Sequence, residues 1–106
     1  MRRLFALVLL ACLAGPGGAR GEALSDCADP DLTAPRTLDV CREALRDPQL
    51  SPAQRARVLT NLGVALAALD RHGDAVDAFD LAVNTDPDLT EARANKARSL
   101  AALGRL

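Results

Sequence analysis

The sequence predicts an all-α protein of about four short helices behind an N-terminal leader. Between Ala56 and Asp88, apolar residues recur at helical spacing on both sides of a short polar turn, which is typical of a helix hairpin. Residues 89–106 then repeat the first arm of that hairpin 34 positions further along the chain. The leader is indicated by an apolar run that follows two arginines at the start of the chain.

Residues 1–23 are expected to be a secretory signal peptide, cleaved after Ala19 or Ala23. Their apolar run extends from Leu4 to Ala14 and ends at a Gly-Pro-Gly-Gly stretch. A helix of that length covers about half of a bilayer core, so it is too short for a stable membrane span. The mature protein is therefore expected to be exported, either to the periplasm or to the extracellular space.

Cys12 keeps a second interpretation of the leader open. The Leu-Leu-Ala-Cys stretch that ends at this residue resembles a bacterial lipobox, in which the cysteine is lipidated, although the apolar run continues beyond it. Membrane contact is expected only if Cys12 is lipidated. Otherwise the residue is lost with the leader.

The balance of charge argues against nucleic acid as a partner. The chain has 13 basic and 14 acidic residues, and a leader that ends at Ala23 removes three arginines and one glutamate. The mature protein then has a net charge near −3. Proteins that bind nucleic acids or anionic membranes instead present an excess of basic residues.

Residues 24–50 are expected to form a disulfide-linked N-terminal segment and one helix. In an exported protein, two cysteines favour a bridge, here between Cys27 and Cys41. The bridge would close a loop of about 15 residues and stabilise the fold by roughly 3 kcal/mol. Free thiols and a redox pair are the alternatives, but the spacing differs from the C-x-x-C of redox enzymes. The helix is predicted from near Arg36 to Asp47, after a turn-rich, extended stretch.

Residues 51–106 are expected to form a helix hairpin and a C-terminal capping helix. The first arm begins after Ser51, with a proline at the first helical position and Gln54 placed for a capping box, and it runs to about Asp70. Gly73 is expected to supply the left-handed conformation of the following turn. The second arm is predicted from Asp74 to Asn84, and its expected buried residues are Ala75, Val76, Phe79, Ala82 and Val83.

The last helix, predicted from Leu89 to Leu106, copies the first arm imperfectly. Asn95 echoes an asparagine of the first arm, whereas Arg93 and Lys96 stand where the first arm has leucines. Polar residues there suit a terminal helix whose outer side faces water.

The hairpin resembles the tetratricopeptide repeat, a helix-turn-helix unit with the pattern W-x2-L-G-x2-Y, then A-x3-F, then P. The residues that carry the resemblance are Leu59, Leu62, Gly63, Leu66, Ala75, Phe79, Ala82 and Pro87. Both aromatic positions of the first arm are leucine in this chain. The resemblance implies a short solenoid of helix hairpins; a hairpin of some other helical bundle is the alternative.

In the register of that repeat, the helix of residues 24–50 is a degenerate second arm of a preceding unit. Cys41 then occupies the large seam position of Phe79, and Ala44 corresponds to Ala82. The bridge to Cys27 would staple the N-terminal segment onto this seam and act as a cap, because an end repeat has no neighbour to cover its apolar face.

No residue set for catalysis, cofactor or metal binding is recognisable. His72 stands alone between two aspartates and is expected to be a turn or seam residue, with a catalytic base as the outside alternative. Asp74, Asp77 and Asp80 are expected to be a solvated helix face, because the glycine and glutamate of a calcium loop are missing. We therefore expect no enzyme, no cofactor and no metal site.

The resemblance implies protein–protein interaction through the groove that the first helices of such repeats line. On this chain that surface would carry Arg57, Thr60, Asn61, Val64, Glu91, Asn95, Arg98 and Ala102. The binding candidates among them are Arg57, Asn61, Val64, Asn95 and Arg98. The expected partner is an unidentified protein or peptide. A structural or self-associating envelope module, with lipid anchorage or homo-oligomers, is the alternative function.

Overall fold

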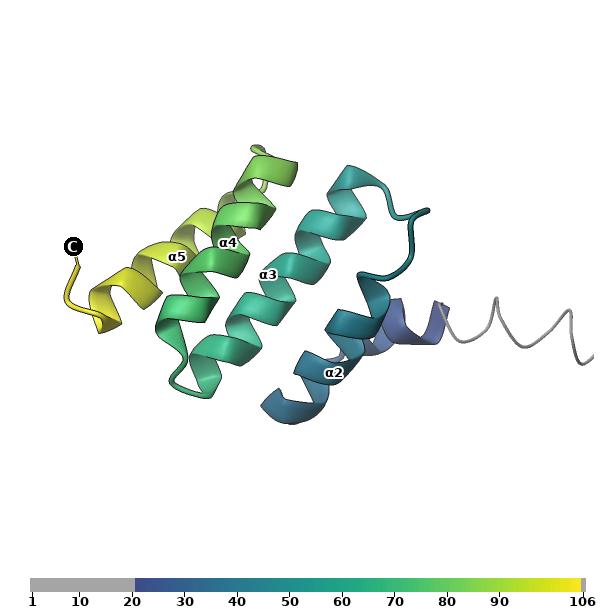
Figure 1. The fold of residues 1–106 in the computed structure, drawn as a ribbon, viewed down its shortest axis with the longest axis horizontal. Helices are drawn as coiled ribbons and strands as arrows, with labels where there is room; N and C mark the ends of the chain where they lie inside the picture. The colour runs from purple at the N-terminus through teal and green to yellow at the C-terminus, as the bar shows by residue number, and fades with distance from the viewer. Residues whose placement is uncertain (1–20, 106) are drawn as a thin grey trace, which may run out of the picture.

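The computed structural model describes residues 21–105, and these residues confirm the predicted all-α class. The named helices are α2 (Ala34–Ala44), α3 (Pro52–Ala68), α4 (His72–Thr85) and α5 (Thr90–Ala102). Residues 21–27 are also helical. Figure 1 shows the four helices side by side in chain order, each packed against the next.

The predicted leader lies mostly beyond the described part of the chain. Residues 1–20, which include Cys12, are outside it. Over residues 21–105, each helix is too short or too polar to span a bilayer.

α2 starts slightly earlier than predicted, at Ala34 rather than near Arg36. Thr33 is extended and Pro35 lies in the first helical turn, where the missing N–H of proline loses no helical hydrogen bond. The Ala34–Pro35 pair therefore belongs to the helix and not to the extended stretch that the sequence indicated.

The start of α3 agrees with the capping box that the sequence predicted. The backbone N–H of Gln54 donates to Ser51 Oγ at 3.1 Å, and the N–H of Ser51 donates to Gln54 Oε1 at 2.9 Å. A cap of this kind stabilises a helix by about 1 kcal/mol. The Arg55 guanidinium also donates to the carbonyl oxygens of Leu45 and Asp47, at 3.3 and 3.0 Å, and so ties the α2–α3 loop to α3.

The turn between α3 and α4 differs from the prediction. The residue with a left-handed backbone is Asp70, with φ of 61°, whereas Gly73 lies inside α4, which begins at His72. The N–H of Asp70 donates to the Ala67 carbonyl at 3.0 Å, and the N–H of Arg71 donates to the Leu66 carbonyl at 2.9 Å. This double hydrogen bond is the Schellman pattern, which closes a helix on a left-handed residue. Aspartate tolerates that conformation better than most residues do.

The same turn recurs at the end of α5. Gly104 has φ of 70°; its N–H donates to the Ala101 carbonyl at 3.0 Å, and that of Arg105 donates to the Leu100 carbonyl at 2.9 Å. Each of these residues lies 34 positions after its counterpart in the α3–α4 turn. The repeat seen in the sequence therefore extends to the backbone conformation.

The contact between α3 and α4 centres on Phe79, whose side chain is 1% exposed. A Cβ atom added at Gly63 would lie 2.7 Å from Cδ1 and 2.8 Å from Cζ of that ring. Carbon atoms that are not bonded prefer separations of roughly 3.5–4.0 Å, so only glycine leaves room for the ring. Of the residues expected to be buried on α4, Val76 and Val83 are only partly buried, and Ala78 is buried in addition.

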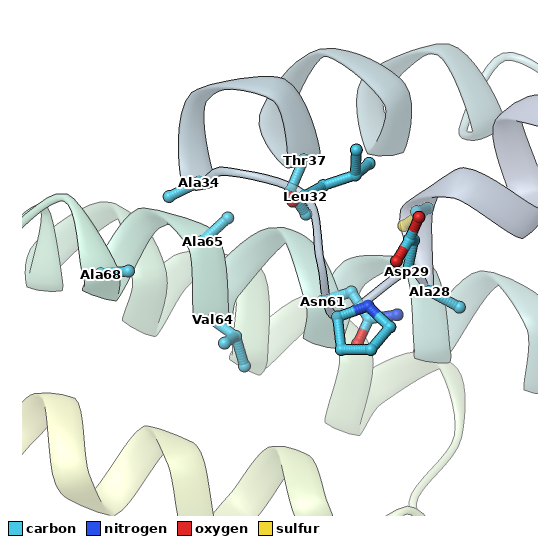
Figure 2. A pocket seen from close by; sticks show the side chains of 11 residues that line it. Ala28, Asp29, Leu32, Ala34, Thr37, Asn61, Val64, Ala65 and Ala68 are labelled. Carbon is cyan, nitrogen blue, oxygen red and sulfur yellow. The ribbon is translucent and has the colours of Figure 1, made fainter.

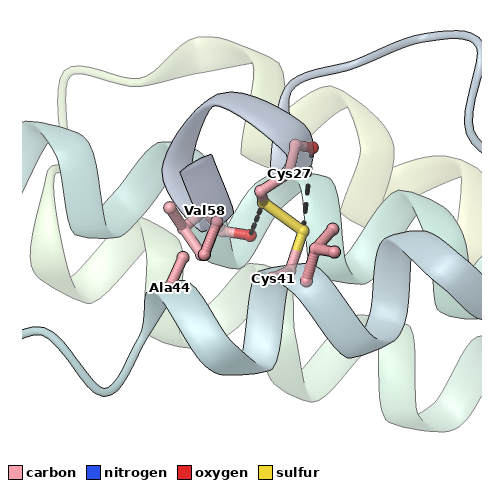
Figure 3. Close-up of a cluster of buried hydrophobic side chains, with 6 residues drawn as sticks. Cys27, Cys41, Ala44 and Val58 are labelled. Carbon is pink, nitrogen blue, oxygen red and sulfur yellow. Dashed lines mark hydrogen bonds between the residues drawn. A yellow bond between two sulfur atoms is a disulfide. The ribbon is translucent and has the colours of Figure 1, made fainter. Parts of the chain in front are cut away.

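Cys27 and Cys41 form a disulfide, as the sequence predicted, and both residues are buried. Figure 3 shows the bond beside Ala44 of α2 and Val58 of α3. The dashed lines join Cys27 Sγ to the Val58 carbonyl at 4.0 Å and Cys41 Sγ to the Cys27 carbonyl at 3.7 Å. Disulfide sulfurs have no proton to donate, so we interpret both as packing contacts. The bridge thus joins the helical segment 21–27 to α2. It lies in a core cluster whose buried residues are Ala23, Cys27, Val40, Cys41, Ala44 and Val58.

The contact between α2 and α3 resembles the contact between α4 and α5. Ala44 of α2 packs in one core cluster with Val58 of α3, and Ala82 of α4 packs in another with Ala92 of α5. Val58 and Ala92 are 34 positions apart, and Ala44 and Ala82 stand in the pairing expected from the sequence. α2 therefore meets α3 much as α4 meets α5.

Candidate binding groove

The first hollow of the candidate site lies between α3 and the N-terminal segment. It has a volume of about 330 Å³ and is lined by residues 28–34 on one side and by Asn61, Val64, Ala65 and Ala68 of α3 on the other. Figure 2 shows these side chains, with the α3 residues on one wall and the chain before α2 on the opposite wall. Its lining is mainly apolar, with the Asn61 amide at one border.

A second hollow adjoins the first at Val64, whose side chain is 44% exposed. It is smaller, about 120 Å³, and lies where α3, α4 and α5 meet. Val64, Ala67 and Phe79 supply its apolar lining. The polar residues that line it are His72 of α4 and Asn95, Arg98 and Ser99 of α5.

Two further hollows lie around Arg57 and Asn61. One, of about 320 Å³, includes Glu91 of α5, and the other, of about 270 Å³, includes Leu24 of the N-terminal segment. All five predicted binding candidates therefore line hollows that share residues with one another. We call this set of hollows the α3–α5 groove.

The polar groups of the groove are only partly paired with each other. The Arg98 guanidinium donates through Nη1 to Asn95 Oδ1 at 2.9 Å, which orients both side chains. The amide N–H groups of Asn95 and the remaining guanidinium N–H groups of Arg98 can still donate to a ligand, because each side chain has more donors than this bond uses. Arg57 and Arg98 are exposed, and both asparagines are half-buried.

Two residues of the wider predicted surface offer no free polar group to it. Thr60 borders the hollow of about 320 Å³, but its side chain is buried and its hydroxyl donates to the Ala56 carbonyl of its own helix at 2.8 Å. A buried threonine commonly satisfies its hydroxyl in this way. Ala102 is exposed but borders none of the hollows described above.

The wall that residues 28–34 supply was not predicted from the sequence. Ala28, Asp29 and Leu32 come from a turn-rich stretch whose local pattern indicates an extended chain, and this stretch lies between the two bridged cysteines. The spacing of the cysteines was the one available signal, because a bridge to α2 returns the intervening chain to the helix.

His72 links the α3–α4 turn to α5. Its Nε2 lies 3.3 Å from Asp70 Oδ1, and its Nδ1 lies 3.4 Å from Ser99 Oγ. A Ser–His–Asp set can support acyl transfer only if the serine reaches a substrate. Ser99 is 2% exposed and the Asp70 side chain is 95% exposed, the reverse of what such a site needs. We interpret the contact as structural.

Two of the three aspartates on the predicted solvated face of α4 form ion pairs. Asp74 pairs with Arg71 at 2.8 Å, and Asp80 pairs with Lys96 of α5 at 2.6 Å. Within residues 21–105, no three histidine, cysteine, aspartate or glutamate side chains are grouped as a metal site.

Comparisons with known proteins identify no relative on which to base the function. No protein-family model matches the sequence, and neither a curated protein nor a solved structure is significantly similar to it.

Proposed function

We propose that this chain is an exported adaptor, similar to a tetratricopeptide-repeat protein, that binds an extended peptide segment of a partner protein in the α3–α5 groove. The observation that carries the proposal is that Asn61 and Asn95, 34 positions apart on two helices, border hollows that share Val64, and Arg98 borders one of them as well.

The chemistry of the groove supports a peptide as ligand. Amide and guanidinium groups can donate to the carbonyl oxygens of an extended chain, and amide oxygens can accept from its N–H groups. Val64 offers exposed apolar surface between these polar groups. Small molecules usually bind in enclosed pockets. A shallow apolar groove with separated polar groups is better suited to the side chains and backbone of a peptide.

The repeat character and the export of the chain rest on other observations. The recurrence of the same helix-closing turn 34 positions later supports a repeat of the tetratricopeptide kind. The buried disulfide supports an oxidising compartment, because such bonds persist mainly in exported proteins.

The proposal is tested with a random peptide library displayed on phage and selected against the oxidised protein. Selected peptides are then titrated by calorimetry against the wild type and the Asn61→Ala/Arg98→Ala variant. We expect this variant to bind about tenfold more weakly or worse, since each lost hydrogen bond costs about 1 kcal/mol.

A matched control removes the same two chemical groups elsewhere. Asn84 and Arg42 are exposed on α4 and α2 and line none of the groove hollows. The Asn84→Ala/Arg42→Ala variant should bind the peptides like the wild type, and circular dichroism should show both variants folded. Equal affinity of all three proteins would rule out the groove as the binding site.

A further inference from the structure

The two ends of the row of helices have opposite charge. Residues 21–46 include six acidic and three basic residues, whereas residues 90–105 include four basic residues and one acidic residue. Figure 1 places these regions at opposite ends: the segment 21–27 lies beside α2, and α5 lies beyond α4. α2 and α5 are not in contact.

At the acidic end, the segment 21–27 and α2 enclose a notch of about 350 Å³. Its charged lining residues are Glu22, Asp26, Arg36, Asp39 and Glu43. Among the described residues, the ion pair made by these carboxylates is that of Glu43 with Arg46, at 3.5 Å between two exposed side chains. Such a pair is weak, so the notch presents several carboxylates with little compensation.

At the basic end, the outward side of α5 combines arginines with small residues. The exposed residues of α5 include Arg93, Ala94, Ala97 and Ala101. Arg98 is exposed as well but also lines the groove, and Arg105 follows in the turn after the helix. Within residues 21–105, the three arginines make no ion pair, whereas Lys96 is engaged by Asp80. Alanines between the arginines let another surface approach the helix closely.

We propose that a second copy of this chain docks here head to tail, with the outward side of α5 of one copy against the acidic notch of the next. The charges select the occupant and its orientation, because two acidic ends or two basic ends repel each other and opposite ends attract. A contact between unlike surfaces leaves one free end of each kind, so copies add into open chains or rings and not into closed two-fold dimers.

The size of α5 limits the strength of this contact. Its 13 residues span about 20 Å, so the contact is smaller than the roughly 1,600 Å² of a standard stable interface. Association is therefore weak, increases with concentration and weakens with salt, because ions screen exposed charges over about 8 Å at physiological strength. This inference goes beyond the adaptor function and does not depend on a peptide in the groove.

The test measures the mass of the full, oxidised protein by sedimentation velocity over a dilution series at low and at physiological salt. We expect the wild type to associate at low salt. The variants Arg93→Glu/Arg105→Glu and Asp39→Arg/Glu43→Arg change exposed residues outside the groove and reverse one end each. Each alone should associate at least about tenfold more weakly, because like charges then face each other.

A mixture of the two variants provides the decisive result. The acidic α5 of the first variant now fits the basic notch of the second, and their unchanged ends fit each other as well, so the equimolar mixture should associate again. Circular dichroism establishes that both variants are folded. A wild type that stays monomeric at low salt, or binds anionic vesicles through α5 without self-association, overturns the proposal. So does a mixture in which association does not return.

Discussion

Two helix contacts in corresponding places of this protein are closed by different chemistry. Between α3 and α4, the ring of Phe79 packs against Gly63 of the preceding helix. Between the segment 21–27 and α2, Cys41 is bonded to Cys27. The repeat register predicted from the sequence makes Cys41 the counterpart of Phe79. If that prediction holds, a covalent bond takes the place of a packed ring.

The two contacts are stabilised in different ways. α3 has 17 residues and offers a full surface to α4, where burial of the Phe79 ring stabilises the contact. A disulfide stabilises mainly by restricting the unfolded chain, so it can hold the segment 21–27 against α2 without a packed ring.

Replacement of Phe79 by alanine should have the largest effect on stability, because it removes the ring and leaves a cavity next to Gly63. We expect Phe79→Ala to lower the free energy of unfolding by about 3–5 kcal/mol, measured by urea denaturation of the oxidised protein. A loss below about 1 kcal/mol would mean that the ring does not hold α3 and α4 together.

Removal of the disulfide should cost roughly 3 kcal/mol, and the loss should be local. In the Cys27→Ala/Cys41→Ala variant, amide hydrogen exchange is expected to accelerate in residues 21–50 and to change little in α4 and α5. Uniform acceleration over all helices would instead show that the N-terminal contact supports the whole fold.

The close approach at Gly63 is tested by adding a single methyl group. Gly63→Ala should destabilise by about 1–3 kcal/mol, because the new Cβ overlaps the Phe79 ring. Gly73→Ala is the matched control: nothing lies within 4 Å of the added Cβ, and the residue is helical. There we expect no loss, or a gain of up to about 1 kcal/mol from helix propensity. Thermal unfolding of both variants measures the contrast.

Replacement of the disulfide by a glycine–phenylalanine contact should have the smallest effect on stability. The Cys27→Gly/Cys41→Phe variant transfers the glycine–ring contact to the N-terminal junction. We expect it to be more stable than Cys27→Ala/Cys41→Ala by about 1 kcal/mol, part of the value of burying a phenyl side chain. Urea denaturation under reducing conditions provides the comparison. Equal stability of the two variants would show that the segment 21–27 cannot form a glycine–ring contact with α2.

Much of this architecture could be predicted from local pattern. Hydrophobic periodicity indicated the helices, the spacing of Ser51 and Gln54 indicated the start of α3, and the two cysteines indicated their bridge. These features depend on residues close in sequence or, for the cysteines, on a single available pairing. The five binding candidates remain predictions; what the structure adds is that they line one groove.

The features that were missed depend on contacts between distant segments. The left-handed residue is Asp70 and not Gly73, because the closing hydrogen bonds of α3 form at Asp70 and Arg71. The preference of glycine for this conformation does not by itself locate the end of the helix. Residues 21–27 are helical and pack in one core cluster with α2 and α3, and residues 28–34 supply a wall of the groove. Thr60 is buried, whereas the repeat resemblance placed it on the groove surface.

The matching turns after α3 and α5 make the molecule extensible. Residues 72–105 begin after one such turn and end in the other. A duplicate of this stretch, spliced in after residue 105, would leave its new junction with the same backbone geometry as the original one. Protein engineers could thus lengthen the array one module at a time, with every added unit presenting a further copy of the Asn95 and Arg98 side chains.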